Sequence, residues 1–351
     1  MEEVLLALSG GVDSSASLLL LKKAGYSPRA IYFSLYAGLP GAPKATPDEA
    51  YKVCSELGIE LEVADLSEQF EEEVVNPFVN AYLTGLTPNP CVWCNRKIKF
   101  SALIKRADEL GIKYIATGHY SRIFKKDGIF YPQKAIDEQK DQSYALCNLT
   151  QGQLSRAIFP LGEYTKAEVR AIAESSSLSS AYSAESQDIC FATDGYRSFI
   201  ESYTGKTQSP GIFIDSGGNA LGKHSGALSY TIGQRRGVGS GFGKRIYVTD
   251  KNMEKNTVTL GDEQDLYSSG VTLNRVNIIS GKFPETPFKA KVKLRYRQKE
   301  SPATVIPEDG GRLRLEFEAP LRAAAPGQWG VIYLGEGKDA YVYGGGIISN
   351  Y

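Results

Sequence analysis

The first 25 residues contain the feature that most restricts the fold of this chain. An apolar run at residues 4–8 leads directly into the glycine turn SGGVDSS at residues 9–15, and a helix-like segment follows up to Gly25. A continuous apolar run is typical of a parallel strand buried on both faces. Gly10 and Gly11 let the backbone approach a ligand closely, and the start of a helix offers free amides and a positive dipole. The turn therefore predicts an anion-binding site.

The same alternation of strand-like and helix-like segments continues through the first half of the chain. Strands are expected at residues 29–35, 59–66 and 112–120, and helices at residues 47–58 and 100–111. This alternation predicts an α/β domain with a doubly wound parallel sheet, in which ligands bind at the carboxyl ends of the strands. Gly118 and His119 close one predicted strand, so we expect them at the same sheet edge as the glycine turn.

Composition narrows the class of protein. Hydrophobic residues make up 42% of the 351 residues, which supports a real core and about two or three domains. No apolar run approaches the roughly 20 residues of a membrane span, and the acidic N-terminus argues against a signal peptide. Five cysteines are not a secreted disulfide framework, and a net charge of zero leaves RNA binding to local basic patches. We expect a cytoplasmic protein without membrane association.

The pattern changes after about residue 195, where short strands with glycine turns replace helices. We expect a catalytic domain at residues 1–199, a small central domain at 200–268 and a β-barrel-like domain at 269–351. The segment 226–251 is rich in Gly and Arg, and it would either follow RNA or cover a site, or act as a plain connector.

One predicted strand, at residues 289–299, carries a basic residue at every second position. Because strand side chains alternate between faces, these residues would share one face: Lys289, Lys291, Lys293, Arg295, Arg297 and Lys299. We interpret this face as a track for RNA phosphates. The alternative is a solvated sheet edge whose charges prevent aggregation.

Cys91 and Cys94 stand in the stretch NPCVWCNRKIKF, at the spacing of a metal or redox pair. The pair alone leaves a zinc staple, a redox couple, a cluster site and a sulfur carrier open. Free thiols are mostly protonated at neutral pH, so a sulfur nucleophile would need activation. Cys54 and Cys147 lie in apolar surroundings and are expected to be buried hydrophobic residues.

Over essentially its full length the chain resembles the tRNA-specific 2-thiouridylases, members of the N-type ATP pyrophosphatase class. Eight motifs carry this resemblance, in this order: LSGGVDSS, GLTPNPCVWCNRKIKF, YIATGHYSR, KDQSYAL, SQDICF, YTIGQRRGVG, KLRYRQ and APGQWGVIY. The resemblance implies that the protein uses ATP to replace the C2 oxygen of the wobble uridine, position 34 of tRNA, with sulfur. An adenylated C2-oxygen intermediate is implied as well.

The resemblance also implies roles for individual residues. ATP, with Mg²⁺, would be contacted by Leu8, Ser9, Gly10, Gly11, Val12, Asp13, Ser14, Ser15, Ser34 and Gly118, and Asp13 would also be catalytic. The tRNA would be contacted by Asn89, Pro90, His119, Lys140, Asp141, Gln142, Arg295, Tyr296 and Gln328. Cys94 would be the nucleophile and Cys190 would carry the persulfide. The sulfur donor of the protein would be a persulfide carrier or inorganic sulfide.

At Cys91 the chain departs from the better-known members, which carry an Asp there with an acid/base role. Two routes for sulfur fit. In one, Cys190 carries a persulfide that Cys94 resolves as a disulfide. In the other, which we favour at this stage, Cys91, Cys94 and Cys190 ligate a [4Fe–4S] cluster, as in the cluster-dependent tRNA thiolases of the same class. Structural zinc is a third possibility.

Two other functions stay open. A synthetase that adenylates a small carboxylate or carbonyl compound would need neither the three cysteines nor the basic strand. A non-catalytic RNA-binding protein with a zinc staple would need no ATP chemistry. Sulfur transfer requires Cys190 to fold back beside Cys91 and Cys94, near the glycine turn.

Overall fold

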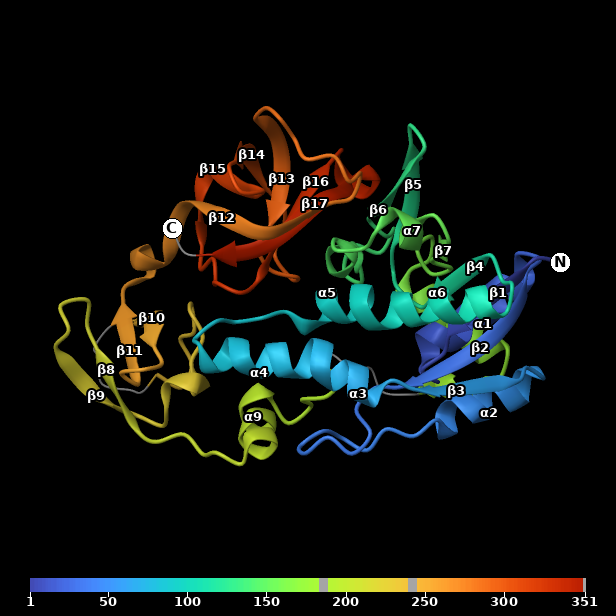
Figure 1. Ribbon diagram of the computed structural model, residues 1–351, viewed down its shortest axis with the longest axis horizontal. Coiled ribbons are helices and arrows are strands. Elements are labelled where there is room, and N and C mark those ends of the chain that lie inside the picture. Colours follow the sequence, from blue (N-terminus) through green and yellow to red (C-terminus); the bar gives the residue numbers. More distant parts are fainter. Residues whose placement is uncertain (183–188, 239–244, 350–351) are drawn as a thin grey trace.

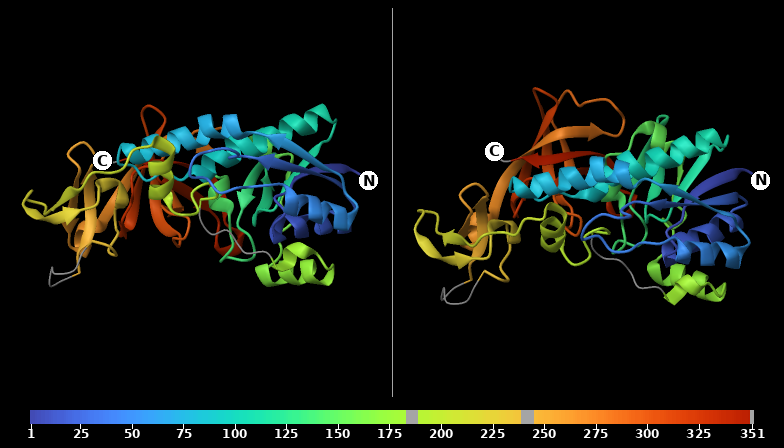
Figure 2. Two further views of the ribbon diagram at one scale, coloured as in Figure 1. Left: turned by 90° about the horizontal axis from the view of Figure 1, so that it is seen from below. Right: turned by 60° about the horizontal axis from the view of Figure 1, so that its bottom comes forward.

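The computed structural model describes residues 1–182, 189–238 and 245–349, and these form three parts, each built on its own sheet (Figure 1). The α/β part contains the N-terminus, the barrel packs above its long helices, and the small central part lies at the opposite end of the molecule. Figure 2 shows the same arrangement from two other directions. Parts of two motifs, residues 186–188 of SQDICF and 239–244 of the Gly/Arg-rich segment, lie outside the described residues.

The first sheet has five parallel strands in the order β3-β2-β1-β4-β7, which confirms the predicted doubly wound fold. Its strands are β1 (Glu3–Ala7), β2 (Ser27–Ser34), β3 (Leu61–Asp65), β4 (Tyr114–Thr117) and β7 (Ala157–Ile158). The central strand β1 has β2 on one side and β4 on the other, so the strand order reverses there. Such a switch point opens a crevice for ligands at the carboxyl ends of the strands.

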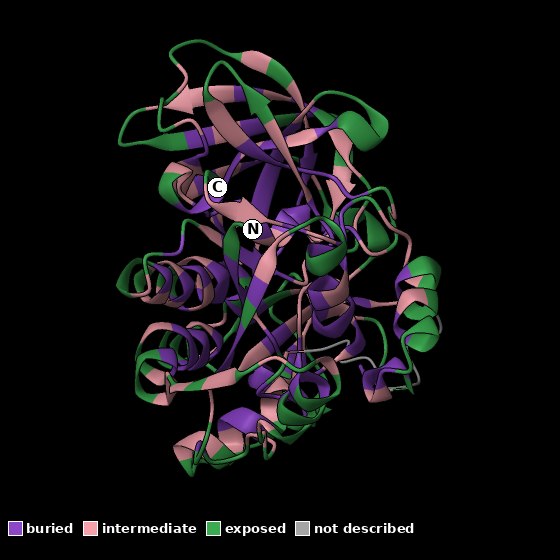
Figure 3. Cartoon of the chain, turned by 90° about the vertical axis from the view of Figure 1, so that its right-hand side faces the viewer, coloured by how far each residue is buried: buried purple, intermediate pink, exposed green. Residues whose placement is uncertain are grey.

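Helices cover both faces of this sheet because successive residues of β1 point to opposite sides. Leu5 packs into the cluster that contains α6 (Phe100–Glu109), whereas Val4 and Leu6 pack into the cluster that contains α1 (Val12–Lys23) and α2 (Asp48–Leu57). Figure 3, coloured by burial, shows buried residues in purple along the strands and on the inner sides of the helices.

Two long helical rods extend from this domain, and each contains a π-helical turn. The first joins α3 (Ser67–Phe70), a π-helical turn (Glu71–Val75) and α4 (Asn76–Leu83). The second joins α5 (Pro90–Cys94), a π-helical turn (Asn95–Lys99) and α6. The remaining helices are α7 (Gln151–Leu154), α8 (Lys166–Ser175) and α9 (Tyr196–Thr204). In the described ranges no helix is both long and apolar enough to cross a membrane.

The central part is a four-stranded sheet in the order β10-β11-β8-β9. Its strands are β8 (Gly211–Ile214), β9 (Ala220–His224), β10 (Tyr247–Asn252) and β11 (Thr257–Gly261). Short 3-10 helices occur at Ser143–Leu146, Ser179–Tyr182, Ala227–Ser229, Glu263–Leu266 and Gly337–Asp339.

The C-terminal part is a closed six-stranded barrel, as expected. Its strands are β12 (Tyr267–Ile278), β13 (Phe288–Lys293), β14 (Ser301–Glu308), β15 (Arg312–Arg322), β16 (Trp329–Leu334) and β17 (Tyr341–Ser349), and pairing of β12 with β17 closes the ring. A hairpin of the α/β domain, β5 (Arg122–Lys126) and β6 (Ile129–Gln133), joins the barrel sheet where Gln133 pairs with Tyr341.

The expected track of six aligned basic residues is wrong. Strand β13 ends at Lys293, and a turn closed by the amide of Gln298 on the carbonyl of Arg295 breaks the alternation. Lys289 pairs with Glu318 of β15, Lys291 pairs with Glu336 in the loop after β16, and Lys293 is buried. The charges on this strand are therefore largely neutralised within the protein itself.

Candidate active site

The glycine turn after β1 has the geometry of an anion site. Gly10 has φ of +85°, and a Cβ there would lie 2.6 Å from the backbone nitrogen of Ala50, so both conformation and space require glycine. The hydroxyls of Ser14 and Ser15 donate to the carbonyl oxygen of Gly11 at 3.1 and 2.9 Å. No side-chain hydrogen bond caps α1 at Gly11, so the backbone amides of the first helical turn can donate hydrogen bonds to an anion.

The other predicted nucleotide residues lie at the same sheet edge. Gly118 follows β4 directly, and a Cβ on it would come within 3.1 Å of the Ser14 backbone nitrogen. Ser34 is the last residue of β2, the neighbour of β1 on the other side. The side chains of Leu8 and Val12 are buried in the core, so these two residues present only backbone to the turn.

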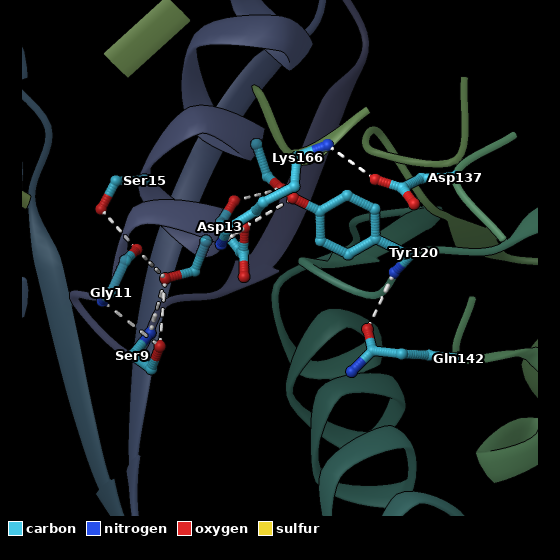
Figure 4. Close-up of polar contacts among 10 residues, drawn as sticks. Ser9, Gly11, Asp13, Ser15, Tyr120, Asp137, Gln142 and Lys166 are labelled. Atoms are coloured by element: carbon cyan, nitrogen blue, oxygen red, sulfur yellow. Dashed lines mark hydrogen bonds and ion pairs between the residues drawn. The ribbon is translucent and has the colours of Figure 1, made fainter. Parts of the chain in front are cut away.

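Asp13 is held by two residues from other parts of the chain (Figure 4). Its Oδ1 accepts hydrogen bonds from the Lys166 Nζ at 2.7 Å and from the Tyr120 hydroxyl at 2.8 Å. The backbone amide of Tyr120 in turn donates to Oε1 of Gln142 at 2.9 Å. Sequence reasoning missed Lys166. The capping-box pattern from Thr165 marks the start of α8, but nothing local indicates that this helix packs beside α1.

The structure brings Cys190 back towards the cysteine pair, as sulfur transfer requires. Pro90 and Asn89 start the short helix α5, and the Asn89 Oδ1 accepts a hydrogen bond from the Cys91 amide at 3.1 Å. Phe191, next to Cys190, packs in the same apolar cluster as Cys94. The charges of Cys190 and Cys91 also contribute to raising the pKa of Cys94, which places the three sulfurs within electrostatic range.

The surroundings of all three thiols disfavour the thiolate, although only Cys94 is a buried residue and Cys91 and Cys190 are exposed. Desolvation raises the pKa of Cys94 to about 12 and that of Cys190 to about 11, and it also raises the pKa of Cys91. The ammonium of Lys99 opposes this shift and lowers the pKa of each thiol. Cys54 and Cys147 are buried, as expected.

The described side chains that could donate to a metal ion are spread apart in this structure. Among the described residues, no three His, Cys, Asp or Glu side chains gather closely enough to hold a metal ion. The three cysteines therefore do not form a site for a single metal ion such as zinc in this arrangement. Mg²⁺ differs, because it commonly uses one carboxylate together with substrate phosphates and water. Asp13, whose side chain is 37% exposed beside the anion-binding turn, fits that mode.

Lys99 links the cysteines to the nucleotide edge. It ends the π-helical turn that follows Cys94, an irregularity often found at functional sites. Burial lowers the pKa of Lys99, but the three cysteines outweigh it, so the pKa is raised. Burial and the charge of Lys99 lower the pKa of His119 to about 3, so this ring is neutral at pH 7, with Nδ1 2.7 Å from the Thr117 hydroxyl.

Residues of the barrel approach the cysteine turn from the other side. The Gln328 Nε2 donates to the carbonyl of Thr87 at 2.8 Å, just before the NPC turn. The Tyr296 ring lies 6.0 Å from that of Tyr144, and the charge of Cys91 is among the causes that raise the pKa of Tyr296. Arg295 instead donates to backbone carbonyls, including that of Ala323 at 2.6 Å.

Asp141 was expected to contact tRNA, but its side chain points into the protein and not outward. Only 5% of the residue is exposed, and burial raises the pKa of its carboxyl. The carboxylate accepts from the amides of Ala135 and Ser143 at 3.1 and 3.2 Å. A carboxylate facing RNA phosphates would be repelled, whereas here it organises the turn that carries Gln142. Lys140 and Gln142 are half-buried.

Comparisons with known protein families and with curated relatives cover almost the whole chain. Three family models match: tRNA methyl transferase HUP domain at residues 2–194, tRNA methyl transferase PRC-barrel domain at 197–262 and aminomethyltransferase beta-barrel domain at 268–348. The tRNA-specific 2-thiouridylases of Moorella thermoacetica and Acetivibrio thermocellus are 44% and 41% identical, over 99% of both chains in each pair. A U34-tRNA thiolase structure from Methanococcus maripaludis, with its [4Fe–4S] cluster, aligns at 20% identity and a TM-score of 0.35, covering 58% of this chain and 70% of that one.

Proposed function

Because the chain belongs to the family of the tRNA-specific 2-thiouridylases, we propose that it is a cytoplasmic tRNA sulfurtransferase that forms 2-thiouridine at the wobble position, using ATP. The observation that carries this function is the connection between two sites. Gly118 packs against the anion-binding turn, and the charge of Lys99 lowers the pKa of the next residue, His119. The three cysteines in turn raise the pKa of Lys99. A small-molecule synthetase would need the first site alone.

The first chemical step activates the uridine. The C2 oxygen attacks the α-phosphorus of ATP, a new C2–O–P bond forms, and the bond to the β-phosphate oxygen breaks to release pyrophosphate. The backbone amides of the turn and the start of α1 stabilise the developing negative charge. A Mg²⁺ ion held by Asp13 and the phosphates would supply further charge neutralisation.

The second step delivers sulfur. The terminal sulfur of a Cys190 persulfide attacks C2 and AMP leaves with the former C2 oxygen. A Cys94 thiolate then attacks the Cys190 Sγ, the sulfur–sulfur bond breaks, and the sulfur stays on the uridine. The resulting Cys94–Cys190 disulfide is reduced by an external thiol, and a persulfide-carrying donor reloads Cys190. Lys99, which favours all three thiolates, assists each attack.

A [4Fe–4S] cluster on the three cysteines is the alternative, and the position of Cys91 within electrostatic range of both partners favours it. We derive no step through the cluster. Iron and acid-labile sulfide should be measured after anaerobic purification of the intact protein and a Cys91→Ala variant. We expect far less than four iron atoms per chain in both. About four per chain, lost in the variant, would establish the cluster instead.

The proposed reaction is tested directly with a tRNA transcript that carries uridine at position 34. We expect 2-thiouridine at that position by nucleoside mass spectrometry when ATP and a persulfide donor are both present. A matched transcript with cytidine at position 34 should stay unmodified. ATP–pyrophosphate exchange that is complete without tRNA, together with no thiolation, would identify a small-molecule synthetase.

A further inference from the structure

The anion-binding turn contains an electrostatic conflict. Asp13 is the second residue of α1, so its carboxylate lies at the helix end whose amides would bind phosphate. A fixed negative charge at that point repels an incoming polyphosphate. In the described structure Lys166 neutralises this charge, with its Nζ 2.7 Å from the Asp13 Oδ1. The ammonium is therefore already at the edge of the phosphate site.

The position of Lys166 does not depend on that ion pair. It is the first residue of α8, which starts with a complete capping box formed by Thr165 and Glu168. The Lys166 amide donates to the Asp137 carboxylate at 2.9 Å. An apolar cluster that includes Val169 of α8, Ala16 of α1 and Tyr120 fixes the two helices against each other. The side chain can therefore change its partner while its backbone stays in place.

Asp13 also keeps a partner if Lys166 leaves it. The Tyr120 hydroxyl donates to the same oxygen at 2.8 Å, and the Gln142 side chain holds the Tyr120 backbone. The carboxylate would thus remain oriented and hydrogen-bonded. Tyr120 and Lys166 therefore have separable tasks, the first holding Asp13 and the second contributing a movable positive charge.

We infer that Lys166 is a phosphate-binding residue of the active site, which moves its ammonium from Asp13 to the β- and γ-phosphates of ATP and then neutralises the pyrophosphate leaving group. This inference rests on the proposed function. It adds to the turn a residue about 150 positions away in the sequence.

The test measures dissociation constants by calorimetry, without tRNA, for three probes: ATP, inorganic pyrophosphate and adenosine. We expect Lys166→Met to weaken ATP and pyrophosphate about ten- to a hundredfold, the range of a charge-assisted hydrogen bond, and to leave adenosine unchanged. Lys166→Arg should restore most of the loss, since it keeps the charge. Lys289→Met is the matched control, because Lys289 also forms an ion pair, with Glu318 at 3.1 Å, but on the barrel.

Two results would overturn the inference. Unchanged ATP affinity in Lys166→Met would mean that the lysine does not reach the phosphates. An equal loss of adenosine affinity would mean that it only supports the shape of the turn. If the unsubstituted protein binds neither ATP nor pyrophosphate, the proposed function itself fails, so the two failures are distinguishable. Melting temperatures should stay within a few degrees, because Asp13 keeps its hydrogen bond from Tyr120 and methionine is similar in length to lysine.

Discussion

Replacing Cys190 with alanine is expected to abolish thiolation, by about a thousandfold or more, while ATP binding stays intact. The residue is the proposed sulfur carrier, and removal of a covalent nucleophile leaves only the contributions of binding and positioning. The measurement is the rate of 2-thiouridine formation under single-turnover conditions. ATP affinity, measured alongside, separates a lost sulfur carrier from a damaged fold.

Cys54→Ala is the matched control for this experiment. Cys54 is a residue of α2 that is buried in the core against β1, so neither tRNA nor a sulfur donor can reach its thiol. We expect thiolation close to that of the unsubstituted protein, with a stability loss of about 1 kcal/mol. Thiolation that survives in Cys190→Ala would exclude both the persulfide and the three-cysteine cluster.

Gly10→Ala should destabilise the protein by about 3 kcal/mol and weaken ATP binding severely. Alanine is strained at φ of +85°, and its methyl group would clash with backbone at 2.6 Å that cannot move aside like a flexible side chain. The turn must therefore distort, and the distortion lies where phosphate would bind. Urea unfolding and ATP calorimetry measure the two effects.

The adjacent glycine provides the control. Gly11 has an ordinary φ of −74°, and a Cβ there would have its nearest neighbour, the Ser9 Oγ, at 3.7 Å. Gly11→Ala should therefore unfold at nearly the same urea concentration as the unsubstituted protein. Equal stability of the two alanine variants would show that the turn is more plastic than its packing against α2 indicates.

The parts of the fold that depend on local sequence patterns could be predicted from the sequence. The strand, turn and helix at the N-terminus, the parallel sheet and the C-terminal barrel are all found, because apolar periodicity and glycine positions decide them over short distances. Lys166 and Lys99 escape sequence reasoning for different reasons. The first depends on which helix packs beside α1, and the second on a π-helical turn that changes the direction of its side chain.

The expectations for the basic strand and for Asp141 were wrong for the same reason. Each assumed that a local sequence pattern decides where a side chain points, whereas contacts with distant parts of the chain decide it. Basic residues continue to alternate after Lys293, but the backbone turns and the strand ends. Asp141 belongs to a polar motif, yet its carboxylate is used to cap backbone amides inside the protein. Only the assembled fold supplies the carboxylates and amides that these side chains contact.

The pairing of Gln133 with Tyr341 has a mechanical consequence. Because the β5–β6 hairpin follows His119 and Tyr120 almost directly in the chain, a shift of the barrel pulls on the strand that ends at the nucleotide edge. We expect the barrel and the α/β domain to move as one body when tRNA docks. Within the described residues the central sheet shares no strand pairing with either, so we expect the adjustment to differently shaped anticodon arms to occur in that part of the molecule.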